Sequence, residues 1–359
     1  MLFEDFPTEI LVDIYLSCTT IIDTINLSTT CHRFRRIYKS SRNLPILEHA
    51  AESQYGPLRD LTQLLTHNAS QAAHLSRDVP FNLLLLKQIV HHGRIAEEWC
   101  SLYPFKKWKH NFEHRRLLKP DECFRLRRAI YRLWLYTRAF HNRAHPRESR
   151  MNKLVVLDRA ALLHNWSTVE LAEIADVHAV MREVVHSNVC PSNGTIARKF
   201  KKRHPDGYAP QLLFNIHLNY PPPPQTPAVN PFFSQFHTTP DVLSNHLHAH
   251  NNTSWHSRKY QTTSYHEPGG EGWGDDIPHY YVVEDMLKLD PEQILWLKEN
   301  APLKGQVEMY VKSLGDWFEN NGETWGQTLE WVLGQRGEEP DDILGAVADG
   351  ELGIAIVDD

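Results

Sequence analysis

Histidine is the residue type in this chain with the greatest capacity for chemistry, since the 359 residues include 22 histidines. His246, His248 and His250 alternate along the sequence, and His256 follows them. On a β-strand, alternating side chains share one face, so these imidazoles would converge on a zinc or copper ion. The stretch is polar and has no cysteine nearby, which favours a surface histidine tract over a preorganised metal site. We predict no metal site and no cofactor.

The other reactive residues do not form a recognisable catalytic pattern. Asp275 and Asp276 stand beside glycine and proline, where paired carboxylates usually build a turn and a helix cap. The sequence contains no phosphate-binding loop, no dinucleotide glycine fingerprint and no Gly-x-Ser-x-Gly elbow. Cys31 falls at an apolar helical position, which is typical of a small core residue and not of a nucleophile. None of these patterns indicates a catalytic site.

The apolar residues near the amino terminus have a spacing suited to docking onto another protein. Pro7 suits the first turn of a helix, and Ile10, Leu11 and Ile14 follow on one face. Asp23 is a suitable cap for a second helix, on which Leu27, Cys31 and Phe34 would line up. Helices this short cannot bury both of their faces alone, so part of their apolar surface must be covered by a partner or by the rest of the chain.

This stretch resembles the F-box, a three-helix module that joins a substrate receptor to an SCF-type ubiquitin ligase. The family pattern begins with Leu-Pro, Glu and apolar residues, and continues through Asp and Leu to a Cys, a basic residue and an aromatic one. Phe6 stands in place of the usual Leu and Phe34 in place of the usual Trp. The matching residues are Phe6, Pro7, Glu9, Ile10, Leu11, Ile14, Asp23, Leu27, Cys31, His32 and Phe34.

The resemblance implies a non-catalytic adaptor. The amino-terminal helices would bind a Skp-type protein, which links to a cullin and a RING subunit, and the rest of the chain would present a target protein. The docking residues that it implies are Phe6, Pro7, Ile10, Leu11, Ile14, Leu27, Cys31 and Phe34. Two alternatives stay open. One is a Skp-binding protein that acts outside degradation, and the other is a metal-binding protein or enzyme that uses the histidine-rich carboxyl-terminal half.

Composition and charge point to a folded protein of the cytoplasm or nucleus. Hydrophobic residues make up 41% of the chain, and its first residues are acidic where a secretory signal would be basic. The longest apolar run, 79–90, is too short to span a bilayer, so no membrane association is expected. Residues 106–203 hold 22 Lys or Arg against 9 Asp or Glu. These basic residues lie on amphipathic helices without a nucleic-acid reading motif, so nucleic-acid binding is not expected.

The predicted fold class is mainly α, with few strands. The predicted segments are an F-box (1–50), an irregular helical domain (51–190), a long Pro/His-rich connection (191–271), a carboxyl-terminal helical region (272–335) and an acidic tail (336–359). The run of four prolines at 221–224 favours extended backbone. Residues 211–218 alternate in polarity and predict a strand. The basic cluster 198–203 is either a nuclear import signal or part of a hydrated linker.

Local signals mark several helices more closely. Residues 81–100 read as one or two helices, with Gly93 a predicted interruption. Pro120 begins a helix, Ser167 and Glu170 form a capping box, and Asp290 caps another helix with Gln293 in the capping-box position. Further helices are predicted over 305–320 and 324–333. Six of the ten tryptophans lie after residue 250, and they predict either an aromatic pocket for a target or a small core.

Overall fold

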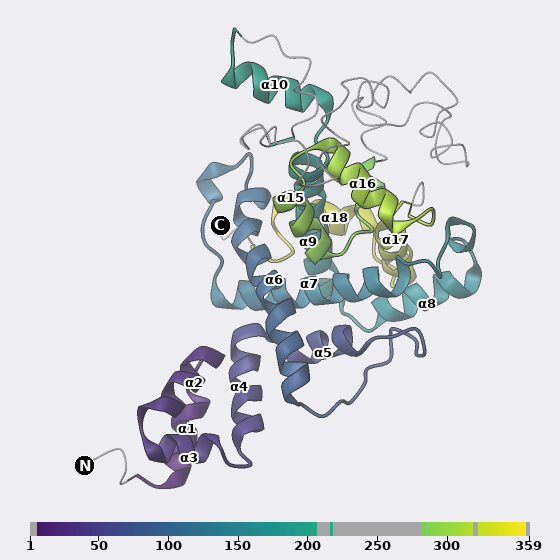
Figure 1. Ribbon diagram of the computed structural model, residues 1–359. Coiled ribbons are helices and arrows are strands. Elements are labelled where there is room, and N and C mark those ends of the chain that lie inside the picture. The colour runs from purple at the N-terminus through teal and green to yellow at the C-terminus, as the bar shows by residue number, and fades with distance from the viewer. Residues whose placement is uncertain (1–5, 207–215, 218–281, 319–321, 357–359) are drawn as a thin grey trace. The chain divides into compact units, whose positions relative to one another are not determined.

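The computed structural model describes residues 6–206, 216–217, 282–318 and 322–356, and this part is mainly helical, as predicted (Figure 1). No β-strand occurs among these residues, and none of their helices is both long and apolar enough to cross a bilayer. The helices are α1 (Thr8–Leu16), α2 (Ile21–Thr30), α3 (His32–Tyr38), α4 (Asn43–Tyr55), α5 (Leu58–Thr66), α6 (Leu83–Lys107), α7 (Pro120–Phe140), α8 (Lys153–His164), α9 (Thr168–Val184), α10 (Asn193–Arg203), α15 (Pro291–Asn300), α16 (Lys304–Leu314), α17 (Trp325–Gln335) and α18 (Pro340–Asp349).

The capping signals confirm that local sequence sets several helix ends. The Ser167 hydroxyl accepts a hydrogen bond from the backbone N–H of Glu170 at 3.3 Å, and the Glu170 carboxylate accepts one from the N–H of Ser167 at 2.9 Å. Asp290 and Gln293 form the same reciprocal box at the start of α15. These bonds satisfy N–H groups that have no partner within the first helical turn.

Gly93 does not interrupt the helix around it, so that prediction is wrong. α6 runs without a break from Leu83 to Lys107, and Gly93 is buried in its middle. A Cβ at this position would lie 2.3 Å from the Tyr55 ring of α4. The glycine therefore serves close packing of two helices and does not end one.

The contacts divide the chain into two compact units whose segments alternate along the sequence. Unit 1 comprises residues 1–139, 161–177 and 333–359, and unit 2 comprises residues 140–160 and 178–332. The five segments expected from composition follow the chain in order and stay a prediction. One of their boundaries, residue 50, falls inside α4, which is continuous from Asn43 to Tyr55.

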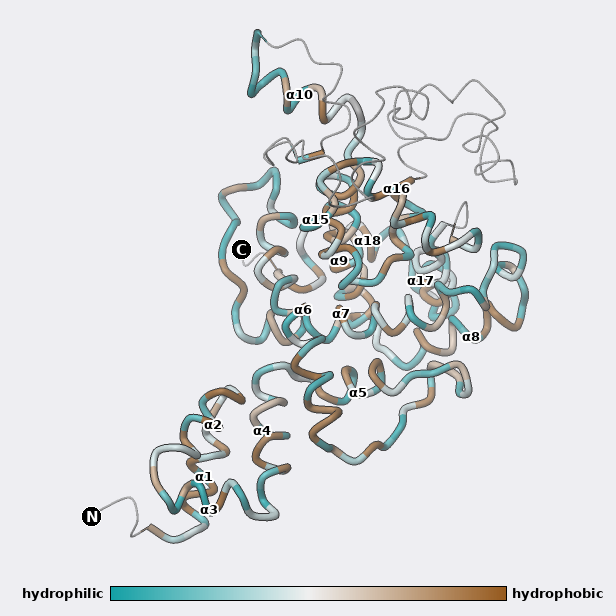
Figure 2. Tube along the Cα trace, in the orientation of Figure 1, coloured by the Kyte–Doolittle hydropathy of each residue, from teal (hydrophilic) through white to brown (hydrophobic). Residues whose placement is uncertain are grey.

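The predicted Pro/His-rich connection and the predicted acidic tail both contain helices. The basic cluster 198–203 belongs to α10, whose cap Ser192 accepts a bond from the N–H of Thr195 at 3.3 Å. The colouring of α10 in Figure 2 is largely hydrophilic. The acidic tail contains α18, followed by Ile354 and Ala355, which are fully buried. The proline run and the stretch His246–His256 lie outside the described residues. So does the predicted strand, of which only residues 216–217 are described.

In unit 1 a single buried carboxylate connects three parts of the chain. Asp176 of α9 accepts hydrogen bonds from the Tyr103 hydroxyl of α6 at 2.5 Å and from the backbone N–H of Ile354 at 3.0 Å. Lys107 lies 2.8 Å from the same carboxylate and donates a second bond to the carbonyl of Val347 in α18. Burial and the neighbouring Asp176 charge raise the pKa of Tyr103, which stays protonated and continues to donate. The carboxyl-terminal segment is thus bound to the centre of unit 1.

A Gly93→Ala substitution should destabilise the protein by about 1–3 kcal/mol, because its Cβ would overlap the Tyr55 ring. Gly345→Ala is the matched control, since Gly345 lies in the helical interior of α18 with no atom near its Cβ position. That control should stabilise by about 0.4–1 kcal/mol. Urea unfolding monitored by circular dichroism measures both. Equal effects of the two substitutions would contradict the packing role of Gly93.

An Asp176→Asn substitution should lower the free energy of unfolding by about 3 kcal/mol, because it leaves the partly buried Lys107 ammonium without its carboxylate. Asp349→Asn, at an exposed position in α18, should change it by less than about 0.5 kcal/mol. The same urea unfolding measurement applies. An Asp176→Asn variant as stable as wild type would show that the buried carboxylate is not needed to hold the carboxyl-terminal segment.

Candidate functional site

The amino-terminal helices begin at Pro7, which is the N-cap of α1 rather than its first residue. α2 is capped by Thr20, whose hydroxyl oxygen accepts a bond from the N–H of Asp23 at 3.0 Å and donates to the Asp23 carboxylate at 2.7 Å. The predicted cap, Asp23, is therefore wrong by three residues. Asp23 lies instead in the first turn, where its charge favours the helix dipole.

Leu27, Cys31 and Phe34 do not share one helix, which corrects a second prediction. α2 ends at Thr30, Cys31 has extended backbone with φ −150° and ψ 165°, and α3 begins at His32. The spacing of four and three residues is compatible with a helix but does not require one. The backbone instead turns at Cys31, so that α3 packs back against α1 and α2.

Residues 6–46, which we call the amino-terminal module, have a small core of their own. Tyr15 is at its centre: its hydroxyl donates to the carbonyl of Phe34 at 2.9 Å, and the two rings meet edge to face at 5.4 Å. Burial raises the pKa of Tyr15, so the hydroxyl keeps its proton and the bond persists at neutral pH. The buried members of the core are Leu11, Tyr15, Phe34, Ile37 and Ile46.

The eight predicted docking residues fall into three groups. Leu11 and Phe34 are core residues, with only 1% and 3% of their surface exposed, so they have almost no surface to offer a partner. Phe6, Ile14, Leu27 and Cys31 are half-buried against that core. Pro7 and Ile10 are exposed.

Helix α2 exposes apolar side chains that sequence reasoning missed, although it also buries Ile21 and packs Leu27 against the core. It buries two hydroxyl residues, Thr24 and Ser28, while Ile22 and Ile25 are 60% and 44% exposed. The buried hydroxyls remain satisfied: Thr24 donates to the carbonyl of Thr20 at 3.1 Å, and Ser28 donates to the carbonyl of Ile25 at 2.6 Å. Ile22 and Ile25 are three residues apart and so share a face of the helix.

The only sequence signal for this surface was the pattern of α2 itself. A helix with isoleucine at 21, 22 and 25 and hydroxyl residues at 24 and 28 has apolar positions that one face cannot accommodate. Ile21 is buried and Ile22 is not. Leu44, at the start of α4, is a further exposed large apolar residue of the module.

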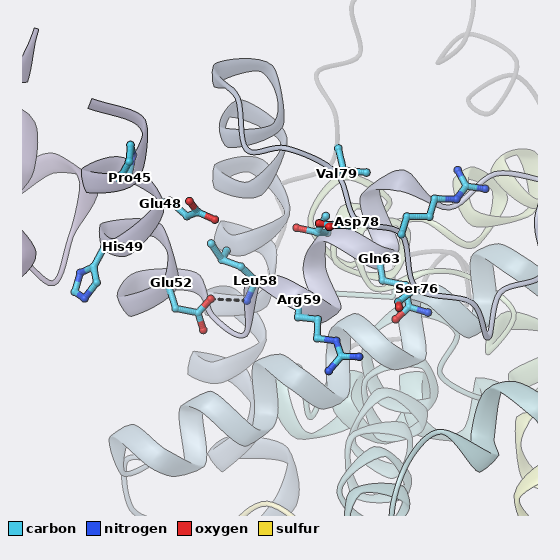
Figure 3. Close-up of a pocket in the computed structure, with 12 residues that line it drawn as sticks. Pro45, Glu48, His49, Glu52, Leu58, Arg59, Gln63, Ser76, Asp78 and Val79 are labelled. Atoms are coloured by element: carbon cyan, nitrogen blue, oxygen red, sulfur yellow. Dashed lines mark hydrogen bonds between the residues drawn. The ribbon is translucent and has the colours of Figure 1, made fainter. Parts of the chain in front are cut away.

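A groove of about 680 Å³ lies beside the module, between α4, α5 and the segment that precedes α6 (Figure 3). Its charges are mixed, with Glu48, Glu52 and Asp78 against Arg59 and Arg77. The lining residues are Pro45, Glu48, His49, Glu52, Leu58, Arg59, Thr62, Gln63, Ser76, Arg77, Asp78 and Val79.

The polar groups of the groove are largely engaged in structural bonds. Arg77 donates to the carbonyl of Thr66 at 2.6 Å and to the side chains of Gln71 and Asn68 at 2.5 and 2.8 Å. The Glu52 carboxylate accepts from the N–H of Leu58 at 2.9 Å, as Figure 3 shows. These bonds hold the loop before α6 and the start of α5 in place.

Unit 2 contains a cluster of buried ionisable side chains that the sequence did not indicate. Burial and the neighbouring Arg182 lower the pKa of His178 to about 4, although Glu284 acts in the opposite direction. Glu284 pairs with Arg182, and burial raises the pKa of its carboxyl. Nearby, Nε2 of His141 accepts a bond from the N–H of Thr324 at 3.2 Å, which requires a neutral ring with its proton on Nδ1.

Positive charges surround His141 in this cluster, and one of the cluster's carboxylates binds the start of a helix. Burial lowers the pKa of His141 well below its ordinary value, and Lys288, Arg150 and Arg159 act in the same direction. Glu323 accepts bonds from the N–H groups of Trp325 and Gly326 at the start of α17. No three His, Cys, Asp or Glu side chains in the described residues are arranged to hold a metal ion.

The carboxyl-terminal aromatic residues divide between core and surface. Trp325 is fully buried, whereas Trp296 is exposed and stacks on Tyr310 with ring centroids 5.3 Å apart. Trp255 and Trp273 lie outside the described residues. The described tryptophans therefore do not converge on one pocket.

Comparison with models of protein families finds none that matches this chain. Neither the curated proteins nor the solved structures contain a match to it. The functional proposal is consequently built from the residues of the chain and their geometry.

The buried histidines predict that stability falls on acidification. The pKa of His178 is lower in the folded protein than its ordinary value of 6.5, so protons bind preferentially to the unfolded chain. The contribution of the neutral ring is complete above about pH 6.5 and is lost as the pH falls towards 4, by about 3 kcal/mol. Calorimetric unfolding of wild type and His178→Gln from pH 7 to 4 measures this.

The His178→Gln variant should lose less stability than wild type over this pH range. His114→Gln, at an exposed position, is the control and should keep the wild-type pH dependence. Parallel stability curves for wild type and His178→Gln would show that His178 titrates normally in the folded state.

Proposed function

We propose that this chain is a substrate-receptor subunit of an SCF-type ubiquitin ligase, docked to a Skp-type adaptor through its amino-terminal module. The observation that supports this is the exposed apolar pair Ile22 and Ile25 on α2, a helix that buries Thr24 and Ser28 beside Ile21. A module that functioned alone would be more stable with the isoleucines inside. The arrangement is favourable when another apolar surface covers the exposed side.

The module's own core changes which residues would carry the docking. Leu11 and Phe34, which the family resemblance places among the docking residues, instead hold the helices together around Tyr15. Their burial fixes the spacing of the helices, and the exposed positions Ile10, Ile22 and Ile25 then provide the contact surface. Core and contact roles thus belong to neighbouring residues of the same short helices.

In this function the chain supplies no catalytic group. The adaptor, through a cullin and a RING subunit, would bring a ubiquitin-charged enzyme close to a target protein held by the rest of the chain. Rate enhancement would come from proximity, which converts an encounter in solution into a reaction within one complex. The target is a protein whose recognition surface on this chain is still to be mapped.

An Ile22→Asp/Ile25→Asp double variant should lose capture of a Skp-type adaptor by about 100-fold or more. Burying each isoleucine stabilises the complex by about 1.5 kcal/mol, and an aspartate would instead have to be desolvated. Isothermal titration calorimetry of the purified full chain with a purified Skp-type adaptor measures the dissociation constant. Substitution of Leu11 is unsuitable for this purpose because it would unfold the module.

Leu83→Asp/Leu84→Asp is the matched control, since these leucines are 62% and 71% exposed but lie at the start of α6, outside the module. It should bind the adaptor as wild type does. In urea unfolding, the free energy of unfolding of each double variant should equal that of wild type to within about 0.5 kcal/mol. Undiminished binding by the module variant, or equal losses in both variants, would exclude docking through α2.

A comparison in cells separates degradation from other Skp-dependent roles. If the chain is a substrate receptor, cells that carry the Ile22→Asp/Ile25→Asp variant in place of wild type should accumulate the target protein. The accumulated target protein should carry fewer ubiquitin conjugates. Quantitative mass spectrometry of both strains measures this. Retained adaptor binding by wild type together with unchanged protein abundances in the variant strain would favour a role outside degradation.

A further inference from the structure

Two cysteines from different helices of unit 1 lie together, although 22 residues separate them in the sequence. Cys100 is on α6 and Cys123 is in the first turn of α7. The Sγ of Cys100 donates a hydrogen bond to the backbone carbonyl oxygen of Cys123 at 3.9 Å, which brings the two cysteines next to each other. Both side chains are half-buried, so neither is enclosed within the core.

The surroundings of Cys123 favour its thiolate. A thiolate in the first turn of a helix is stabilised by the helix dipole and by nearby cations. Arg127, one turn further along α7, supplies a positive charge, while Glu122 and Asp121 oppose it. The Glu122 charge is compensated by Arg116, whose guanidinium makes two bonds of 2.6 Å to that carboxylate.

The two thiols are therefore different acids. The hydrogen bond from Cys100 and the charge of Arg127 lower the pKa of Cys123 to about 7. The same hydrogen bond, together with burial and Glu97, raises the pKa of Cys100. A low-pKa, accessible cysteine beside a second thiol is the arrangement found in redox-sensitive cysteine pairs.

We infer that Cys100 and Cys123 form a peroxide-sensitive dithiol, in which Cys123 reacts first and Cys100 resolves it to an intramolecular disulfide. This inference is independent of the docking function and concerns a modification site between α6 and α7.

The chemistry is balanced with a hydroperoxide as the oxidant. The Cys123 thiolate attacks one peroxide oxygen, the O–O bond breaks, and the other oxygen leaves as hydroxide and takes up a proton to become water. Cys123 is then a sulfenic acid. The sulfur of Cys100 attacks the sulfur of Cys123, the S–O bond breaks, and the departing hydroxide takes the Cys100 proton to form a second water. Two thiols are oxidised and one peroxide is reduced.

The product would join the two ends of the segment 101–122. This segment exposes three large apolar side chains, Phe105, Phe112 and Leu117. A disulfide between the residues that flank this segment would restrict its movement, because it closes a loop of chain that is otherwise held only by non-covalent contacts.

Treatment of the native full chain with hydrogen peroxide tests the inference. After the reaction, the remaining thiols are alkylated in denaturant and the protein is digested without reduction. Lysines and arginines between the two positions let trypsin separate the two cysteine peptides. We expect a cross-linked Cys100–Cys123 peptide, about 2 Da lighter than the sum of its free peptides. Cys18, Cys31 and Cys190 should remain alkylated.

Two variants separate the roles of the cysteines. In Cys100→Ala, Cys123 should stop at the sulfenic acid, which dimedone traps, and the pH at which iodoacetamide reacts half-maximally with Cys123 should shift upwards. In Cys123→Ala, Cys100 should stay reduced under the same conditions. Cys190, which is fully buried and whose pKa burial raises to about 12, is the internal control for an inert thiol.

Several results would overturn the inference. One is a peroxide-treated chain in which Cys100 and Cys123 are alkylated to the same extent as Cys190. Another is a set of disulfides between other cysteines in place of this one. A third is oxidation of Cys100 that persists in Cys123→Ala. Circular dichroism of each variant before treatment ensures that these outcomes report on the folded protein.

Discussion

The close contact between Gly93 and the Tyr55 ring is the constraint that lets α4, which leaves the amino-terminal module, pack against α6. α4 begins in the core of the amino-terminal module at Ile46 and reaches α6 at Tyr55 without a break. The hydroxyl of Tyr131 in α7 donates to the carbonyl of Tyr55 at 2.8 Å, so the end of α4 is fixed by two further helices. The module is therefore joined to the rest of unit 1 by a continuous helix. A side chain at position 93 would push that helix away.

Features that depend on a few adjacent residues could be predicted from the sequence, and features that depend on distant residues could not. The capping boxes at Ser167 and Asp290 are local, and both are present. Gly93 does not interrupt its helix as predicted, because the residue that requires a glycine there, Tyr55, is 38 residues away in the sequence. The sequence predicts that the carboxyl-terminal segment is a tail. Its binding partner, Asp176, belongs to a different helix, and no local pattern identifies Asp176 as a contact of this segment. Tertiary contacts override local preference in each of these cases.

The docking residues show the same limit within a single helix. Periodicity assigns Ile10 and Leu11 to one apolar stripe, but Leu11 packs beneath Tyr15 while Ile10 remains exposed. A helical stripe broad enough to cover both a core and a partner contains residues of both kinds. Only the position of the neighbouring helices separates them. Within the amino-terminal module the most exposed apolar pair is Ile22 and Ile25, and the turn at Cys31 is needed to identify it.

Several arginines of the basic middle segment hold the fold together, whereas the basic residues of α10 are exposed; both facts bear on the class of partner. Arg128 binds Glu173 at 2.6 Å, and Arg132 binds both Asp60 at 2.5 Å and Glu170 at 2.8 Å. Guanidinium groups fixed in this way are not available to contact phosphates, as a nucleic-acid surface would require. The exposed isoleucines of α2, by contrast, have no internal use, because their helix buries hydroxyl residues in their place. Apolar docking to another protein is therefore the interaction that the exposed residues of the module favour.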